Sequence, residues 1–106
     1  MIEVWVRRDG GKIAGYRVEG HAGWAESGSD IVCAAVSALT IAAANGLDRL
    51  AGAVSKSESS EGRLEVVLKG GIGEKAEVKA EAILETMLGG LRDIREEYPG
   101  RIKIYD

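Results

Sequence analysis

Apolar and polar residues alternate along several stretches of the chain, and this two-residue period is typical of β-strands that bury one face. Four stretches have the pattern clearly, with charged residues between the apolar ones. A fifth stretch is serine-rich and has the pattern only weakly. The predicted strands cover residues 2–7, 12–19, 53–60, 64–69 and 101–106.

Two short glycine-containing segments, residues 9–11 and 61–62, lie between neighbouring strands. Glycine adopts a positive φ at no steric cost, so both segments are suited to tight hairpin turns. Each hairpin makes its two strands antiparallel neighbours. In the second strand the alternation predicts that Ala14, Tyr16 and Val18 lie on one face.

Two longer segments have the composition or periodicity of helices. The first is rich in alanine and leucine; we expect it to start at residue 31, after Asp30 as the N-cap, and to end between residues 46 and 50. The second runs from about residue 74 to 97 and is stopped by Pro99. Its apolar side chains recur at steps of three and four, which predicts one buried stripe of Ala76, Ala80, Ile83, Met87, Leu91, Ile94 and Tyr98.

These elements follow the order ββαββαβ within one predicted domain, residues 1–106. Two helices packed on a mostly antiparallel sheet make a two-layer α+β fold. The first helix is apolar on nearly all sides, whereas one sheet covers only one of its faces. The other face needs a second helix or a second subunit. We therefore predict a homodimer with this helix at or near the interface.

The composition excludes several classes of protein. Hydrophobic residues make up 45% and charged residues 29% of the 106 positions, as in a globular domain. A net charge of −3 gives no support for nucleic acid as a direct partner. The apolar run at residues 31–44 is too short to span a membrane, and the N-terminus lacks the apolar block of a signal peptide. One Cys and one His build neither an internal disulfide nor a Cys/His zinc site, and a lone thiol fits a reducing, cytoplasmic location.

The histidine and the cysteine of the chain lie close together in the sequence. His21 is in a glycine-rich loop, and Cys33 is in the first turn of the first predicted helix. With Asp30 as N-cap, Cys33 takes the N3 position, beside unpaired backbone N–H groups and the positive end of the helix dipole. Both favour thiolate over thiol, and the N–H groups can hold an oxyanion. The segment thus offers a nucleophile, a base and hydrogen-bond donors for acyl transfer.

Each candidate residue also has a purely structural interpretation. A free cysteine commonly fills space in a core, and a lone loop histidine is commonly solvated. Asp30 either caps the helix or orients His21. Ser37, one turn after Cys33, either bonds to a helix carbonyl or contacts the thiol. Trp24 either faces a substrate or packs against the sheet. The pattern alone leaves these alternatives open.

The segment Gly20-His21-Ala22, then Gly28, then Asp30-Ile31-Val32-Cys33-Ala34-Ala35-Val36-Ser37 resembles the signature of the bacterial ribosomal-processing cysteine proteases. The chain length, the ββα opening and Tyr98-Pro99 before the final strand resemble that family too. The resemblance implies a cytoplasmic α+β homodimer. It also implies an endopeptidase that removes a short N-terminal extension from a large-subunit ribosomal protein.

Carried over position by position, the resemblance makes Cys33 the nucleophile and His21 the general base. Asp30 and Ser37 fall on motif positions with supporting roles. The resemblance implies no metal and no cofactor. It also implies that the glycine-rich loop, residues 20–29, orders around the substrate peptide and brings His21 toward Cys33; the loop residues that it assigns to the substrate are Gly20, Ala22, Trp24 and Gly28.

Two other functions are compatible with the same residues. In the first, the protein is a non-catalytic, ribosome-associated dimeric binding module in which the thiol is structural. A structural thiol reacts slowly with iodoacetamide, which separates this function from catalysis. In the second, Cys33 is a redox sensor that forms a sulfenate or an intersubunit disulfide. The chain has no second cysteine to resolve a sulfenate, which weakens the redox hypothesis.

Overall fold

The part of the chain that the structure describes forms seven elements, in the order that the sequence predicts. The computed structural model describes residues 1–20 and 27–106, with residues 27–30 described by their backbone only. The order ββαββαβ is confirmed. The elements are β1 (Ile2–Asp9), β2 (Lys12–Glu19), α1 (Ser27–Ala51), β3 (Val54–Ser60), β4 (Arg63–Leu68), α2 (Glu74–Glu97) and β5 (Ile102–Tyr105).

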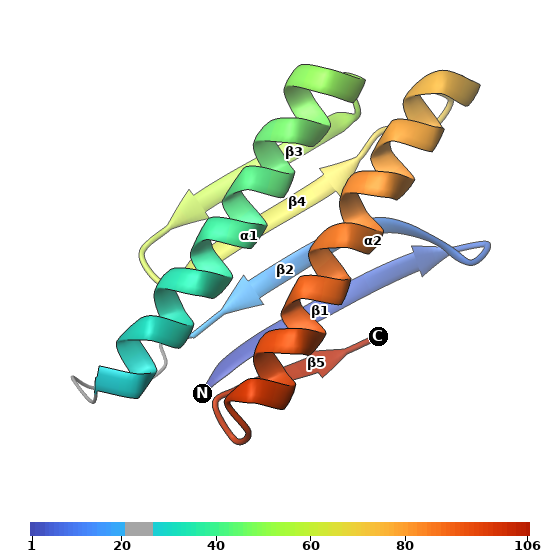
Figure 1. Ribbon diagram of the computed structural model, residues 1–106. Coiled ribbons are helices and arrows are strands. Elements are labelled where there is room, and N and C mark those ends of the chain that lie inside the picture. The colour runs from blue at the N-terminus through green and yellow to red at the C-terminus, as the bar shows by residue number, and fades with distance from the viewer. Residues whose placement is uncertain (21–26) are drawn as a thin grey trace.

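The strands form one sheet in the order β3-β4-β2-β1-β5, and both helices cover the same face of it (Figure 1). Both hairpins are antiparallel, as is the β2–β4 pair, and only β5 pairs in parallel with β1. The predicted two-layer α+β class is therefore confirmed. In this order β3 is an edge strand, and it lies beside α1.

A β-bulge in the first hairpin adds one residue to the buried side of β2. Arg7 pairs with Gly15, but Arg8 pairs with Ile13, so Ala14 is the extra residue. A bulge shifts the two-residue period by one position. Ile13 is therefore buried in the core together with Tyr16, although the predicted alternation does not include it, and Gly15 is buried as well.

The core lies between the sheet and the two helices. β1 contributes Ile2 and Val4, which are almost fully buried. The predicted stripe on α2 is buried or half-buried along its length, and the buried face is wider than the stripe. Two leucines that the stripe leaves out lie at its centre, and the five buried residues of α2 are Ala80, Leu84, Met87, Leu88 and Leu91.

The first helix begins at Ser27, one turn before the predicted start, and ends at Ala51. Asp30 is therefore a residue of the first turn, and its predicted role as N-cap is wrong. The sequence offers several starts, because Ser and Asp both favour helix N-termini. One glycine inside a helix costs only about 1 kcal/mol, so Gly28 does not prevent the earlier start.

The same helix is long and apolar enough to cross a membrane by length and composition, over Ile31–Ala51 with a mean hydropathy of 1.6. In this fold, however, it packs on the sheet and on α2. Val32, Val36 and Leu47 are at most 1% exposed. We therefore treat α1 as a core helix whose outer face is also apolar.

Candidate active site

Cys33 lies in the second turn of α1, at the edge of the core. Its side chain is half-buried and packs against the core cluster. Val32 and Val36, on the same helix, are fully buried and anchor this part of α1 to the sheet. The packing of two valines thus fixes the position of the thiol while leaving part of it accessible.

Cys33 lines a groove of about 190 Å³ between α1 and the ends of three strands. The α1 side of the groove is a helical ridge of residues at steps of three and four. The strand side is the end of β2 and the β3–β4 turn. The lining residues are Val18, Gly20, Cys33, Ser37, Thr40, Ile41, Ser59, Ser60, Gly62, Arg63 and Leu64.

Three of the residues singled out from the sequence meet in this groove: Gly20, Cys33 and Ser37. Ser37 is exposed, one helical turn from Cys33. The segment with His21, Ala22 and Trp24 lies outside the described residues. Gly28 and Asp30 are in the first turn of α1, and their side-chain positions are not described.

The backbone of Gly20, the residue before His21, is held in place by its close contact with one neighbouring segment and its hydrogen bond to another. Its φ is +99°, and a Cβ at this position would overlap with the carbonyl oxygen of Met1. Its N–H donates a hydrogen bond of 2.9 Å to the carbonyl of Gly62 in the β3–β4 turn. A residue with a side chain is therefore strained here. Gly20, which precedes the segment with His21, is thus hydrogen-bonded to another residue of the groove wall.

The earlier start of α1 changes the expected electrostatics at the thiol. Cys33 is the seventh residue of the helix, not the N3 residue. Only the first four N–H groups of a helix lack a partner within it, and the effect of the dipole falls off within the first turn. The predicted stabilisation of a thiolate and an oxyanion by the helix start is therefore not supported at this position.

A buried hydrogen-bond network supports the groove from below. The Tyr16 hydroxyl donates a 2.8 Å bond to the carbonyl of Thr40, and the Thr40 hydroxyl donates a 2.8 Å bond to the carbonyl of Val36. Burial raises the pKa of Tyr16, so its hydroxyl keeps its proton and remains a donor. The network joins β2 to the part of α1 that lines the groove.

Several lining residues were not singled out from the sequence. Ser59 and Ser60 belong to the serine-rich stretch. Its weak alternation was the one feature of the sequence that set this strand apart from the others. Ile41 is a large apolar residue of α1, yet it is 48% exposed. Arg63 lies at the groove and bonds outward, with its Nε 3.1 Å from a carboxylate oxygen of Glu19.

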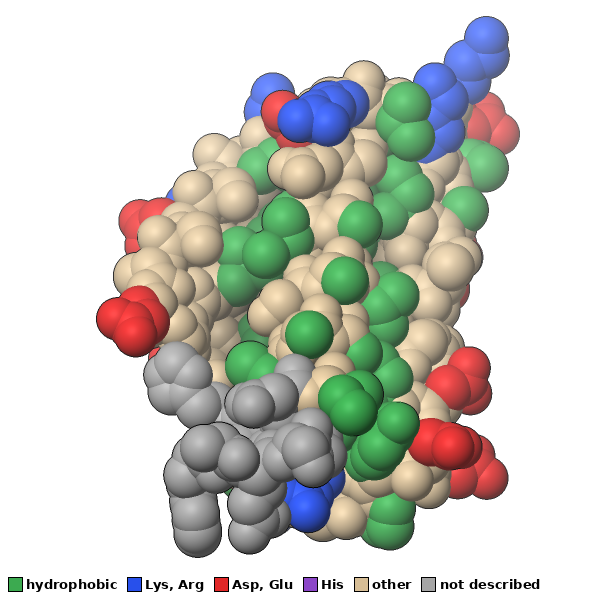
Figure 2. Space-filling model, turned by 60° about the vertical axis from the view of Figure 1, so that its left-hand side comes forward, with side chains coloured by type: hydrophobic (Ala, Val, Ile, Leu, Met, Phe, Trp, Pro, Cys, Tyr) green, Lys and Arg blue, Asp and Glu red, His purple; other side chains and the backbone are tan. Residues whose placement is uncertain are grey.

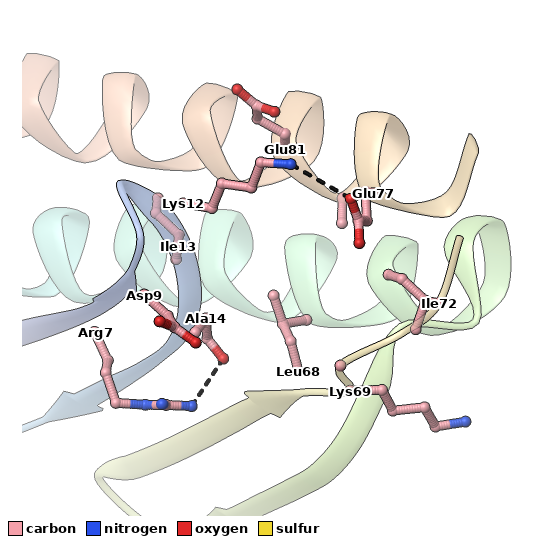
Figure 3. A pocket seen from close by; sticks show the side chains of 12 residues that line it. Arg7, Asp9, Lys12, Ile13, Ala14, Leu68, Lys69, Ile72, Glu77 and Glu81 are labelled. Carbon is pink, nitrogen blue, oxygen red and sulfur yellow. Dashed lines mark hydrogen bonds and ion pairs between the residues drawn. The ribbon is translucent and has the colours of Figure 1, made fainter. Parts of the chain in front are cut away.

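A larger cavity, of about 270 Å³, lies at the opposite ends of β2 and β4 (Figure 3). Its floor is apolar, with Ile13 and Leu68, and its rim carries charges of both signs. Lys12 pairs with Glu77 at 3.4 Å across the rim. Its described lining contains no Cys, Ser, Thr or His, so the cavity offers no thiol, hydroxyl or imidazole side chain for a cysteine- or serine-type mechanism. Among the residues that the structure describes, no three potential ligands gather to hold a metal ion.

Comparison with known proteins assigns the chain to a family. The family described as Cysteine protease Prp matches residues 1–103. The ribosomal processing cysteine protease Prp of Bacillus subtilis is 31% identical over 107 residues, which cover 98% of this chain and 96% of that protein.

Two crystal structures of S. aureus Prp have the same fold. The complex with a substrate peptide has a TM-score of 0.84 and 30% identity, and covers all of both chains. The complex with a covalently linked product peptide has a TM-score of 0.82 and 30% identity, and covers 99% of this chain and 98% of that one. These matches, together with the half-buried thiol in an open groove, show that the chain is a cysteine protease that belongs to the Prp family of ribosomal processing proteases.

Proposed function

We propose that this protein is an endopeptidase that removes a short N-terminal extension from a large-subunit ribosomal protein. The observation that carries the proposal is the position of the chain's one cysteine, half-buried at the wall of an open groove. A cysteine protease needs a thiol nucleophile. Cys33 supplies it, and the one imidazole of the chain, His21, is the general base.

In the proposed reaction the Cys33 thiolate attacks the carbonyl carbon of the scissile peptide bond and forms a C–S bond. The resulting tetrahedral intermediate expels the amine, which takes a proton from the His21 imidazolium. The product is a thioester and a free N-terminus. His21 then removes a proton from water as the water oxygen attacks the thioester carbon. The tetrahedral intermediate breaks the C–S bond and expels the Cys33 thiolate, and the acid product gives its proton to solvent and leaves as a carboxylate. The step needs no redox partner.

Ser37 and Asp30 have supporting roles in this proposal. The exposed Ser37 hydroxyl lines the groove one turn from Cys33 and can bond to the substrate carbonyl or to the thiol. Asp30, in the first turn of α1, orients His21. Gly20, Ala22 and Trp24, together with Gly28 at the start of α1, enclose the peptide.

We further propose that the protein is a cytoplasmic homodimer. Ribosomes assemble in the cytoplasm, where the substrate would be found. The outer face of α1 carries a row of exposed apolar side chains, with Ile31 at 55% and Ile41 at 48% exposed. Exposed alanines fill the row between them at positions 34 and 38. Figure 2 shows hydrophobic side chains gathered along this side of the molecule. A second copy that covers this row would remove it from water.

The test is cleavage of synthetic peptides that cover the N-terminal segments of the large-subunit ribosomal proteins of the source organism, read by mass spectrometry. We expect one cut in one peptide by the wild type, and no cut by Cys33→Ala or His21→Ala. Ser55→Ala is a suitable control, because Ser55 is exposed and lies outside the groove.

The same experiment separates catalysis from the alternative of a non-catalytic binding module. A catalytic thiol reacts readily with iodoacetamide at neutral pH, whereas a structural thiol reacts slowly. A wild type that cuts no peptide and has an unreactive Cys33 would overturn the protease proposal in favour of the binding module.

A further inference from the structure

The inner face of the edge strand β3 is polar where a two-layer fold normally has apolar residues. Cross-strand partners point to the same side of a sheet. Ser59 pairs with Leu64, and Ser57 pairs with Val66. Leu64 and Val66 are 8% and 1% exposed and face the helices. Ser57 and Ser59 therefore also face the helix layer, yet both are exposed. Part of β3 beside α1 is thus uncovered.

We propose that Ser57 and Ser59 form a track that holds the main chain of an extended substrate peptide next to Cys33. We call this pair the serine track. The inference rests on the proposed protease function and deepens it by naming the surface that positions the substrate. Ser59 lines the groove together with Cys33. Ser57 is two residues away on the same face, about 7 Å along the strand.

The direction of the track follows from the topology. α1 and β3 run side by side in opposite directions (Figure 1). The groove reaches from Cys33 to Ile41 on α1, and it contains the end of β3 at Ser59 and Ser60. The serine track therefore leads from the thiol along α1. On the opposite side, α1 forms the wall of the groove with Ser37 and Thr40.

The chemistry of the track suits a peptide main chain. A serine hydroxyl both donates and accepts, so it can satisfy either an N–H or a C=O group. Edge strands are commonly protected by charged residues. The charged residues of β3, Lys56 and Glu58, are on the open face of the sheet. Lys56 forms ion pairs with Glu58 and with Glu65, and Glu58 is the cross-strand neighbour of Glu65. Protection of the edge thus does not account for the small, uncharged side chains in the groove.

The test compares two bulky substitutions on the same strand. Ser59→Trp places a large side chain in the groove, and Glu58→Trp places the same side chain on the open face. The readout is kcat/KM for the peptide that the wild type cleaves, from the set of ribosomal-protein N-terminal segments. We expect Ser59→Trp to lose at least about tenfold in kcat/KM, and Glu58→Trp to stay within about twofold of the wild type. Equal activity of the two variants would overturn the serine track.

A second pair of variants covers the case in which Ser59→Trp fails to fold. We expect the double variant Ser57→Ala with Ser59→Ala to raise KM by about fivefold for each hydrogen bond lost, with kcat nearly unchanged. Ser59→Thr keeps the hydroxyl, so its KM should stay close to that of the wild type and well below that of the double variant. An unchanged KM in the double variant would also overturn the inference.

The rate of Cys33 alkylation by iodoacetamide should be the same in the double variant and the wild type, which shows that the nucleophile is intact. Failure of the serine track leaves cleavage by the wild type, and its loss in Cys33→Ala, in place. Failure of the proposed function removes cleavage by the wild type itself, and the serine track falls with it.

Discussion

The Tyr16 hydroxyl on β2 donates a buried hydrogen bond of 2.8 Å to the backbone carbonyl of Thr40 on α1. The bond joins the sheet to the helix that carries Cys33. Thr40 also lines the groove, so the network beneath it holds one wall of the candidate active site at a fixed height above the sheet.

Loss of this hydrogen bond should lower stability measurably. We expect Tyr16→Phe to reduce the free energy of unfolding by about 1 kcal/mol, because it removes one buried bond and keeps the ring. Urea denaturation measures the change. Tyr105→Phe is the control, since Tyr105 bonds to Glu3 at the surface and should lose much less. Equal losses in the two variants would contradict a special role for the buried bond.

The adjacent glycines of α2 provide a test of the helix–helix packing. Nothing lies within 4 Å of a Cβ built on Gly89, whereas one on Gly90 would approach Leu39 of α1 at 2.9 Å. Alanine favours a helix over glycine by about 0.5–1 kcal/mol. Gly89→Ala should therefore stabilise the protein by about that amount. Gly90→Ala should give less, or a net loss, because Leu39 must move.

Thermal denaturation of both variants checks the comparison. Since the two glycines share nearly the same helix propensity, the difference between the variants isolates the contact with Leu39. A Gly90→Ala variant as stable as Gly89→Ala would mean that the two helices adjust freely at this point.

The sequence predicted the order of the elements because four of the five predicted strands alternate clearly and both hairpin turns contain glycine. It did not predict the bulge at Ala14. A bulge depends on how two strands pair, and the pattern of one strand does not record it. The start of α1 was misplaced for a related reason, since Ser27 and Asp30 are both suitable residues for a helix N-terminus.

The candidate site was predicted only in part. Cys33 and Ser37 share a helix face by their spacing, and the structure places both in one groove. Ser59 and Arg63 lie beside the β3–β4 turn, and they line the groove because this end of the sheet lies next to α1, whose Cys33 is distant along the chain. The serine-rich strand appeared weak because its helix-facing positions are polar. The deviation from a normal strand pattern is therefore also the signal of the groove.

Ser37 should contribute to turnover more than to binding if it contacts the reacting groups. We expect Ser37→Ala to lower kcat about tenfold with little change in KM, since one hydrogen bond to a reacting group is worth about 1.4 kcal/mol in the transition state. Steady-state kinetics on the cleaved peptide give both constants. A rise in KM alone would place Ser37 in substrate binding instead.

The carboxylate of Asp106 joins β1, α2 and the end of β5, and it makes stability depend on pH. Arg8 binds it through two bonds of 2.7 and 3.0 Å, and Arg92 adds one of 3.0 Å. The hydrogen bonds from Arg8 hold the pKa of Asp106 below its ordinary value of 3.8. A depressed carboxylate pKa stabilises the fold above the unfolded-state value, and this stabilisation is lost as the pH falls through the folded-state value.

Asp106→Asn should therefore melt at a lower temperature than the wild type at pH 7, and the difference should shrink as the pH falls below 3.8. Melting temperatures measured across this range test the dependence. Asp93→Asn, an exposed change on α2, should show no such trend. A difference that is constant with pH would indicate that the side-chain shape, not its charge, matters at position 106.

The proposed dimer gives a prediction with a closely matched control. Ala38 lies in the apolar row on the outer face of α1, and Ala82 is an exposed alanine inside α2. Aspartate at either position carries the same small cost in helix propensity. At the interface, however, a charge must be buried without a partner. We expect Ala38→Asp to be monomeric and Ala82→Asp to remain dimeric in analytical ultracentrifugation at micromolar concentration. A wild type that sediments as a monomer would overturn the proposed dimer, and a dimeric Ala38→Asp would move the interface away from this face of α1.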